Sequence, residues 1–285
     1  MIPGPMLRGI REFEPLPAAA HEILNILCQE KSPDTGLQIS GVLERHRLAT
    51  RILAVFNSPL YVGRYPVEHV DEAVTRFGGP TVLDVILSDY LSLLQLDAPI
   101  YGLRADEAFL HAAMASLAVF ELIRENPRKE LPRIASTAAL LHDVGKILMS
   151  RYFEAKPEDL AAECRREEIT FSAVEMRHFG CHHGQVGAAL ARHWGFPDGM
   201  VEAIEKHHDS PLPAPTALVD AVALSNLVAK TVGVGLGAEG MNFVIDAGCY
   251  TRLGFDFNAF CRVCARTASA IGELRKTYPT KSYQS

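Results

Sequence analysis

The sequence of 285 residues is long enough for one large domain or two of ordinary size. Its hydrophobic content of 48% and its charged content of 22% are typical of a globular protein and exclude a disordered chain. The net charge of -6, with no basic run interleaved with aromatic residues, argues against a nucleic-acid surface, so we expect no nucleic acid as a partner.

The N-terminal residues show no secretory signal, and no stretch of the sequence is long and apolar enough to cross a bilayer. The six cysteines lie scattered along the chain, unlike the cysteines of a disulfide framework. We therefore expect a cytoplasmic protein that does not interact with a membrane.

Helical periodicity dominates the chain, and strand signals are nearly absent. Before residue 100 the pattern predicts helical segments over residues 16–27, 37–56, 67–74 and 80–96. Pro and Gly in residues 97–102 interrupt the pattern and mark a domain boundary. Further helices are predicted over residues 108–125, 137–149, 184–193, 197–208, 216–230 and 257–274. The expected fold class is all-α, with two helical lobes, residues 1–100 and 101–285.

A histidine next to an aspartate lies in a strongly apolar segment. His142 and Asp143 fall within residues 137–149, which are apolar on nearly every face. Burying such a pair costs free energy unless both groups are paired or bind a metal. The other candidate ligands are His111, His183, His207, His208 and Asn226. Histidine is the commonest metal ligand in proteins, although a lone histidine on an apolar face is more often a hydrogen-bonded core residue.

Several motifs follow one another in a specific order. They are Phe13-Glu-Pro-Leu-Pro-Ala18, Arg51-Ile-Leu-Ala-Val-Phe-Asn-Ser-Pro-Leu-Tyr61, Leu140-Leu-His-Asp-Val-Gly-Lys146 and the run from His183 through Trp194 and Pro197 to His207-His208. With them the chain resembles the HD superfamily of metal-dependent phosphohydrolases and, within it, the HD-related output domain (HDOD) family. The resemblance extends over roughly residues 12–275 and implies that the second lobe is an HD-like helical bundle.

The resemblance implies a set of metal-site positions: His111, His142, Asp143, His183, His207, His208 and Asn226. Among them, His183, His207 and His208 fall where the phosphodiesterase branch with the HD-GYP signature keeps further ligands. Asn226 stands where the family has an aspartate, which removes one negative charge and weakens the hold on a cation. The resemblance thus implies a divalent transition metal (Fe, Mn, Ni or Zn), bound weakly or not at all.

Two further features bear on chemistry. The Gly-Tyr-Pro element of cyclic-di-GMP phosphodiesterases is missing, since residues 209–215 read Asp-Ser-Pro-Leu-Pro-Ala-Pro. Lys146 follows the His-Asp pair by three residues and is a candidate phosphate contact. The alternative for Lys146 is an ammonium group that reaches solvent or pairs with a carboxylate.

The resemblance implies a bacterial signal-transduction output module, of the kind found in response regulators, that acts through protein-protein interaction with a signalling partner. The alternative is a working metal-dependent phosphohydrolase acting on a nucleotide or phosphate ester; oxidative di-iron chemistry, known elsewhere in the superfamily, is a third. We favour the signalling module because of Asn226 and the missing Gly-Tyr-Pro element. The oligomeric state stays open.

The first lobe carries no candidate metal ligand. Its motifs fall within residues 13–61, and Asn57-Ser58-Pro59 is the predicted bend, because Asn and Ser bond to nearby backbone and Pro cannot continue a helix. We expect this lobe and the cleft beside it to bind the partner. The alternative is that it only covers an apolar face of the second lobe.

Overall fold

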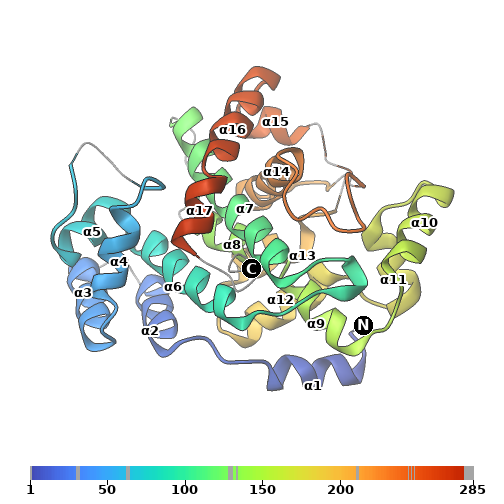
Figure 1. Ribbon diagram of the computed structural model, residues 1–285, viewed down its shortest axis with the longest axis horizontal. Coiled ribbons are helices and arrows are strands. Elements are labelled where there is room, and N and C mark those ends of the chain that lie inside the picture. The colour runs from blue at the N-terminus through green and yellow to red at the C-terminus, as the bar shows by residue number, and fades with distance from the viewer. Residues whose placement is uncertain are drawn as a thin grey trace. The chain divides into compact units, whose positions relative to one another are not determined.

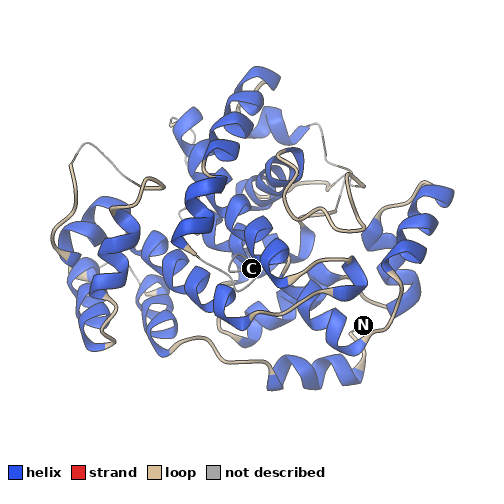
Figure 2. Cartoon of the chain, in the orientation of Figure 1, coloured by secondary structure: helices blue, strands red, loops and turns tan. Residues whose placement is uncertain are grey.

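The computed structural model describes residues 2–278, except 30–32, 62–64, 128–130, 133, 210, 211, 243, 245 and 247. The regular secondary structure of these residues is helical, and the strand-type pairing found among them is an isolated bridge between Ala98 and Leu103. Figure 2 accordingly shows helices joined by loops. The prediction of an all-α protein is confirmed.

The chain forms two compact units. The large unit comprises Met1–Glu14 and Gln95–Ser269, and the small unit comprises Pro15–Leu94 and Ala270–Ser285. The break after Leu94 lies close to the predicted boundary at residue 100. The two chain ends are assigned differently from the predicted lobes, because the first segment groups with the large unit and the last segment with the small one.

The small unit consists of α2 (Ala18–Cys28), α3 (Thr35–Arg45), α4 (Ala49–Phe56), α5 (Val70–Phe77), α6 (Gly79–Leu94) and α17 (Ile271–Thr277). Arg51 joins three of these helices. Its guanidinium donates to the Asp89 carboxylate of α6 at 2.5–3.1 Å and to the Thr277 carbonyl of α17 at 2.9 Å. A sequence motif residue therefore serves to assemble this unit.

The Asn-Ser element forms a bend after α4. The Asn57 side chain donates to the Val67 carbonyl and accepts from the Val67 amide, both at 2.8 Å. The Ser58 hydroxyl donates to the Val55 carbonyl at 2.6 Å. Both side chains thus satisfy nearby backbone groups, as the sequence predicted.

The large unit consists of α1 (Gly4–Glu12), η1 (Pro99–Tyr101), α7 (Ala105–Glu125), α8 (Ala135–Leu141), α9 (Val144–Tyr152), α10 (Pro157–Glu167), α11 (Phe171–Phe179), α12 (His183–His193), α13 (Asp198–Lys206), α14 (Ala217–Thr231), α15 (Gly248–Leu253) and α16 (Phe257–Ser269). Figure 1 labels these helices. The long helix α7 packs against α8, α14 and α16. Its residues Ala118 and Leu122 join Leu224, Val228 and Val263 in a buried apolar core.

Several predicted helices are divided. Residues 37–56 form α3 and α4, separated where Arg47 adopts a φ of 57°. Residues 137–149 form α8 and α9, so the prediction of a continuous helix through His142 and Asp143 was wrong. The break between α8 and α9 matters for function because it places His142 and Asp143 in a turn, outside a regular helix.

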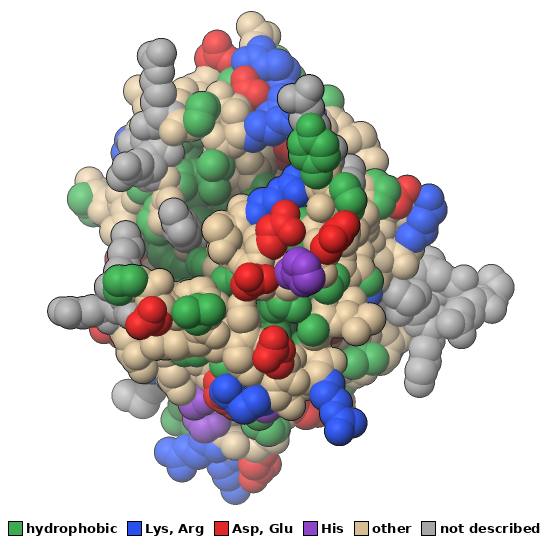
Figure 3. Space-filling model, turned by 90° about the vertical axis from the view of Figure 1, so that its left-hand side faces the viewer, with side chains coloured by type: hydrophobic (Ala, Val, Ile, Leu, Met, Phe, Trp, Pro, Cys, Tyr) green, Lys and Arg blue, Asp and Glu red, His purple; other side chains and the backbone are tan. Residues whose placement is uncertain are grey.

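The surface carries charges of both signs. On the face drawn in Figure 3, Lys and Arg side chains are interspersed with Asp and Glu side chains. Among the described residues, no single helix is long and apolar enough to cross a membrane, although the bent pair α5 and α6 passes by length and composition.

Candidate metal centre

Most of the predicted ligands lie at helix ends. His142 and Asp143 occupy the turn between α8 and α9, and His183 is the first residue of α12. His207 and His208 follow the end of α13, so the helix predicted to run to residue 208 ends two residues earlier. At a helix end, side chains of adjacent residues can converge on one point.

His111 and Asn226 come instead from the middle of the two long helices α7 and α14, which pack against each other. The Nε2 of His111 lies 3.1 Å from the Asn226 side-chain oxygen. Every position that the sequence singled out as a metal ligand is therefore brought to one region of the large unit.

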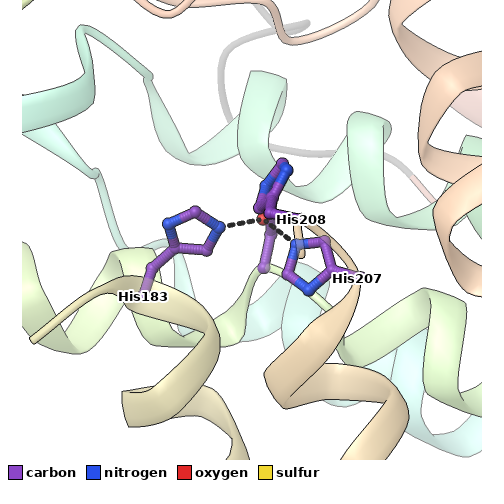
Figure 4. Close-up of side chains that lie close together, drawn as sticks. His183, His207 and His208 are labelled. Carbon is purple, nitrogen blue, oxygen red and sulfur yellow. Dashed lines mark ion pairs between the residues drawn. The ribbon is translucent and has the colours of Figure 1, made fainter. Parts of the chain in front are cut away.

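The ligand atoms form two overlapping groups. One contains Asp143, His183, His207 and His208, and the other contains His111, His142 and Asp143. Within each group the atoms lie within 4.8 Å of one another, and Asp143 belongs to both. Figure 4 shows the rings of His183, His207 and His208 gathered around one point.

Asp143 is the centre of the arrangement. The Nε2 atoms of four histidines lie near its carboxylate, at 3.3 Å for His183, 3.4 Å for His142, and 3.6 Å for both His111 and His207. Its side chain is only 12% exposed, while the His142 and His183 side chains are fully buried.

The opposite nitrogen of each of these four rings is anchored. Nδ1 donates to the Val234 carbonyl from His111, to the Ala139 carbonyl from His142, to the Glu175 carboxylate from His183 and to the Ile204 carbonyl from His207, at 2.7–2.9 Å. Because a carbonyl or carboxylate oxygen only accepts, each Nδ1 carries a proton. The rings are thus held with Nε2 facing the shared point, the arrangement that metal-binding histidines use.

The atoms that face this point lack hydrogen-bond partners of acceptable geometry: Nε2 of His142, His183, His207 and His208, and Oδ1 of Asp143. Buried polar atoms are rarely left unsatisfied in folded proteins, and a cluster of them needs an explanation. A divalent cation would satisfy Asp143 together with His183, His207 and His208, and His142 belongs to the other group on Asp143, so these residues fit a metal.

The contact between His111 and Asn226 has a separate consequence. Burial lowers the pKa of His111 to about 4, so its ring is neutral near pH 7 and its Nε2 is an acceptor. Two acceptors 3.1 Å apart attract only when the amide is turned to present its NH₂ group or when a cation bridges them.

Glu175 and Tyr101 form a hydrogen-bonded chain with His183, on the side of the ring away from Asp143. Glu175 is fully buried on α11, accepts from the His183 backbone amide at 3.2 Å as well as from its ring, and also accepts a hydrogen bond from the Tyr101 hydroxyl. Burial lowers the pKa of His183, but Glu175 and Asp143 outweigh it and raise that pKa to about 9. A cation at Nε2 would therefore have to displace a proton.

Two buried lysines complete the site. Lys146 donates to Asp143 at 2.7 Å and to Glu239 at 2.9 Å, and Lys230 donates to Glu239 at 2.6 Å. Burial disfavours the charged form of Glu239, but the two lysines outweigh it and lower its pKa to about 2. The Lys146 ammonium is therefore paired with carboxylates, which is the alternative that the sequence analysis gave for it.

A cavity adjoins the ligand cluster. It is partly open to solvent, and its lining includes His207, His208 and Asn226. The cations on its wall are all paired: Lys206 with Glu202 at 2.7 Å, Lys230 with Glu239, and Arg252 with Asp220 and Asp246 at 2.7 and 2.8 Å.

We expect the metal-free protein to lose stability as the pH falls from 6.5 to about 4. Burial lowers the pKa of His111 to about 4 and that of His207 to about 3, whereas both are about 6.5 when unfolded. The unfolded state binds more protons in this window. For His111 alone, this lowers the free energy of unfolding by on the order of 3 kcal/mol. His183 acts in the opposite sense: because its folded pKa of about 9 lies above the unfolded value, its contribution to stability grows as the pH falls to 6.5 and is nearly complete below 6.5.

Urea unfolding of chelator-treated protein between pH 6.5 and 4.5 measures this loss. A His111→Gln variant is the matched comparison, since it removes one of the titrating rings. A denaturation midpoint that stays constant over this range would contradict the buried, neutral histidines.

Sequence reasoning missed four residues of the site: Tyr101, Glu175, Lys230 and Glu239. A signal was present for Glu175, because Phe171, Val174 and Glu175 share the i, i+3, i+4 face of α11, and an acid on an apolar face needs a buried partner. The others carry no comparable signal, since their partners lie far away in sequence.

Comparisons with known proteins place this arrangement in context. A family model, HDOD domain, matches residues 14–210. That range includes the histidines of the cluster and ends before Asn226. No curated protein matches the chain.

Solved structures share the fold. An HDOD domain protein of unknown function from Geobacter sulfurreducens is 24% identical with a TM-score of 0.68, over 96% of this chain and 97% of that one. A proposed phosphohydrolase from Shewanella amazonensis is 20% identical with a TM-score of 0.65, over 96% and 98%. A proposed signal transduction protein from Marinobacter aquaeolei is 21% identical with a TM-score of 0.62, over 94% and 59%. The family match covers more than half of the sequence, and the chain belongs to the HDOD domain family.

Proposed function

We propose that this protein is a signal-transduction output module of the bacterial cytoplasm that acts by contact with another signalling protein. Its HD-type site is then a regulatory metal centre that does not turn over a substrate. Family membership supports a signalling role, and the electrostatics of the site support the loss of catalysis.

The observation that carries this proposal is the pairing of the cations around the site. Phosphoryl transfer enzymes leave Lys, Arg or metal charges free to hold the phosphate and the charge that develops on it. Here Lys146 and Lys230 share Glu239, while Lys206 and Arg252 are held by other acids. A phosphate ester entering this cavity would have to break an existing ion pair.

A metal would be held by Asp143, His183, His207 and His208, with His111, His142 and Asn226 on the other side of Asp143. The many imidazoles suit Fe, Mn, Ni or Zn. When bound, such an ion makes hydroxide available near neutral pH and neutralises phosphate charge. Asn226 supplies one neutral oxygen where a carboxylate would supply a charge, so we expect weak or incomplete occupancy.

We expect no enzymatic hydrolysis of cyclic-di-GMP or of simple phosphate mono- and diesters. While Glu239 holds both lysines, a phosphate must first break an ion pair, so that part of the binding energy is not available to lower the barrier. Purified protein loaded in turn with Fe, Mn, Ni or Zn is incubated with each ester, and the products are separated by chromatography. Metal-dependent turnover that disappears in Asp143→Ala would overturn the proposal.

The second candidate function, a metal-dependent phosphohydrolase, is favoured by one observation. The group of Asp143, His183, His207 and His208 keeps a charged ligand and three imidazoles next to a cavity. The turnover experiment separates the two candidates, whereas detection of a bound metal does not.

Contact with a partner would use residues that the small unit does not need for its own fold. Arg51, Asn57 and Ser58 are engaged internally, but Leu37 on α3 is 69% exposed and Leu93 on α6 is 79% exposed. Large exposed apolar side chains are candidates for contact surfaces, although single ones also occur without a function.

We expect Leu37→Glu and Leu93→Glu, made separately, to leave the free energy of unfolding within about 0.5 kcal/mol of wild type. At least one of them should abolish capture of the cellular partner in a pull-down with full-length protein. Capture of the same partner by both variants would show that these side chains are not in the contact. Deletion of residues 1–100 is a poorer test, because it removes segments of both units.

A further inference from the structure

Glu239 bridges two buried ammonium groups. Its side chain is 5% exposed, as is that of Lys146, and the Lys230 side chain is 2% exposed. One carboxylate oxygen accepts from Lys146 at 2.9 Å and the other accepts from Lys230 at 2.6 Å. Lys146 also donates to Asp143 at 2.7 Å. Two buried ammonium groups on either side of one carboxylate form a site that would bind a small oxyanion if Glu239 were absent.

The loop after α14 delivers Glu239 to this place. Gly235 and Gly237 adopt φ values of 59° and 51°, and the loop is held by a bond from the Ala238 amide to the Tyr101 carbonyl at 2.8 Å. Side chains would not fit at either glycine: a Cβ on Gly235 would lie 2.7 Å from His111 Cβ. The backbone can therefore approach the metal cluster closely enough for Glu239 to reach both lysines.

The adjoining cavity reaches one of these charges, that of Lys230. Lys230 lines it together with His207 and His208, whose Nε2 atoms have no hydrogen-bond partner. Val244, beyond the Glu239 loop, lines this cavity and also a second one on α10 and the α10–α11 turn. The segment after Glu239 therefore borders open space that does not belong to the ligand cluster.

We propose that Glu239 is an internal anion that occupies a phosphate-binding site formed by Lys146 and Lys230. A phosphate group, free or as a monoester, is the external ligand that this site would take when Glu239 withdraws. The inference deepens the proposed function, on which its regulatory meaning rests, by naming the ligand class that the site would sense. Binding itself is measured without a partner and without turnover, so failure of one proposal leaves the other standing.

Isothermal titration of chelator-treated, full-length protein with inorganic phosphate at fixed ionic strength tests the inference. We expect Glu239→Gln to bind phosphate at least tenfold more tightly than wild type, because the two lysines lose the carboxylate that they share, while Lys146 keeps Asp143. The matched control is Glu202→Gln, which frees Lys206 on the wall of the same cavity and should leave the affinity unchanged. Equal affinities of wild type and Glu239→Gln, with the variant folded by circular dichroism, would overturn the proposal.

Two further variants keep the result interpretable. Adding Lys230→Met to Glu239→Gln should remove the gain, and a persistent gain would place the phosphate elsewhere and overturn the proposal. If Glu239→Gln does not fold, Glu239→Asp replaces it, since the shorter acid cannot reach both lysines; it should bind phosphate more tightly than wild type, and no gain would count against the site.

Glycerol phosphate titrated in parallel separates the two sources of the ligand. Tighter binding of the ester than of inorganic phosphate identifies a phosphate monoester that also contacts the cavity wall. Equal binding of both identifies free phosphate as sufficient. Binding of neither by Glu239→Gln would refute the inference.

Discussion

Replacing Gly145 by alanine is expected to lower the free energy of unfolding by about 3 kcal/mol or more. Helices α9 and α12 touch at this residue, where an added Cβ would collide with the His183 carbonyl oxygen and lie 2.7 Å from the Gly187 amide nitrogen. Both neighbours are backbone atoms, so relief requires the helices to separate, and overpacking of this kind is costly. The separation would also move His183 away from Asp143.

Chemical denaturation measures this loss, and Gly199→Ala is the matched control. Gly199 lies in α13, and an added Cβ there would meet nothing nearer than Leu218 at 3.9 Å. Its replacement should change the free energy of unfolding by less than about 1 kcal/mol, in the stabilising direction. If Gly145→Ala proved as stable as wild type, α9 and α12 could not be in such close contact.

Replacing Asn226 by aspartate is expected to raise the affinity for a divalent transition metal by about tenfold or more, because affinity follows the number of charged ligands. The new carboxylate would take the place of an amide oxygen that already lies 3.1 Å from His111 Nε2. Competition with a chromophoric chelator gives the affinity, and elemental analysis gives the occupancy.

Asn25→Asp is the control for this experiment, since it adds the same charge on an exposed position of the small unit. It should leave metal affinity unchanged. Full and equal occupancy in wild type and Asn226→Asp would show that position 226 does not bind the metal.

The fold was largely accessible from the sequence because apolar residues recur at helical spacing through most of the chain. The breaks were less accessible. Arg47 takes a left-handed conformation that residue type does not signal, and the turn at His142 and Asp143 lies between two runs of mostly good helix formers, residues 138–141 and 146–149. The assignment of the chain ends to the two units depends on contacts between segments far apart in the sequence, such as α1 with α9 and α12, and Arg51 with Thr277.

The candidate ligands were found through a resemblance, whereas the residues that orient and neutralise them were not. Lys230 and Glu239 look like ordinary surface charges in the sequence, and their contact with each other and that of Glu239 with Lys146 account for their burial. Glu175 was accessible in principle from the helical face that it shares with Phe171. Pairing between distant charges is a property of the folded chain, and helical periodicity carries no information about it.

The contact between Arg51 and Thr277 also has a consequence for synthesis on the ribosome. Residues 15–94 leave the ribosome early, yet α17 completes their unit only after the whole large unit has been translated. At about 5 to 20 residues per second this interval is on the order of 10 to 40 s. During that time the nascent small unit lacks its last helix, with Arg51 missing one of its acceptors, so early recognition by chaperones should concentrate on residues 15–94.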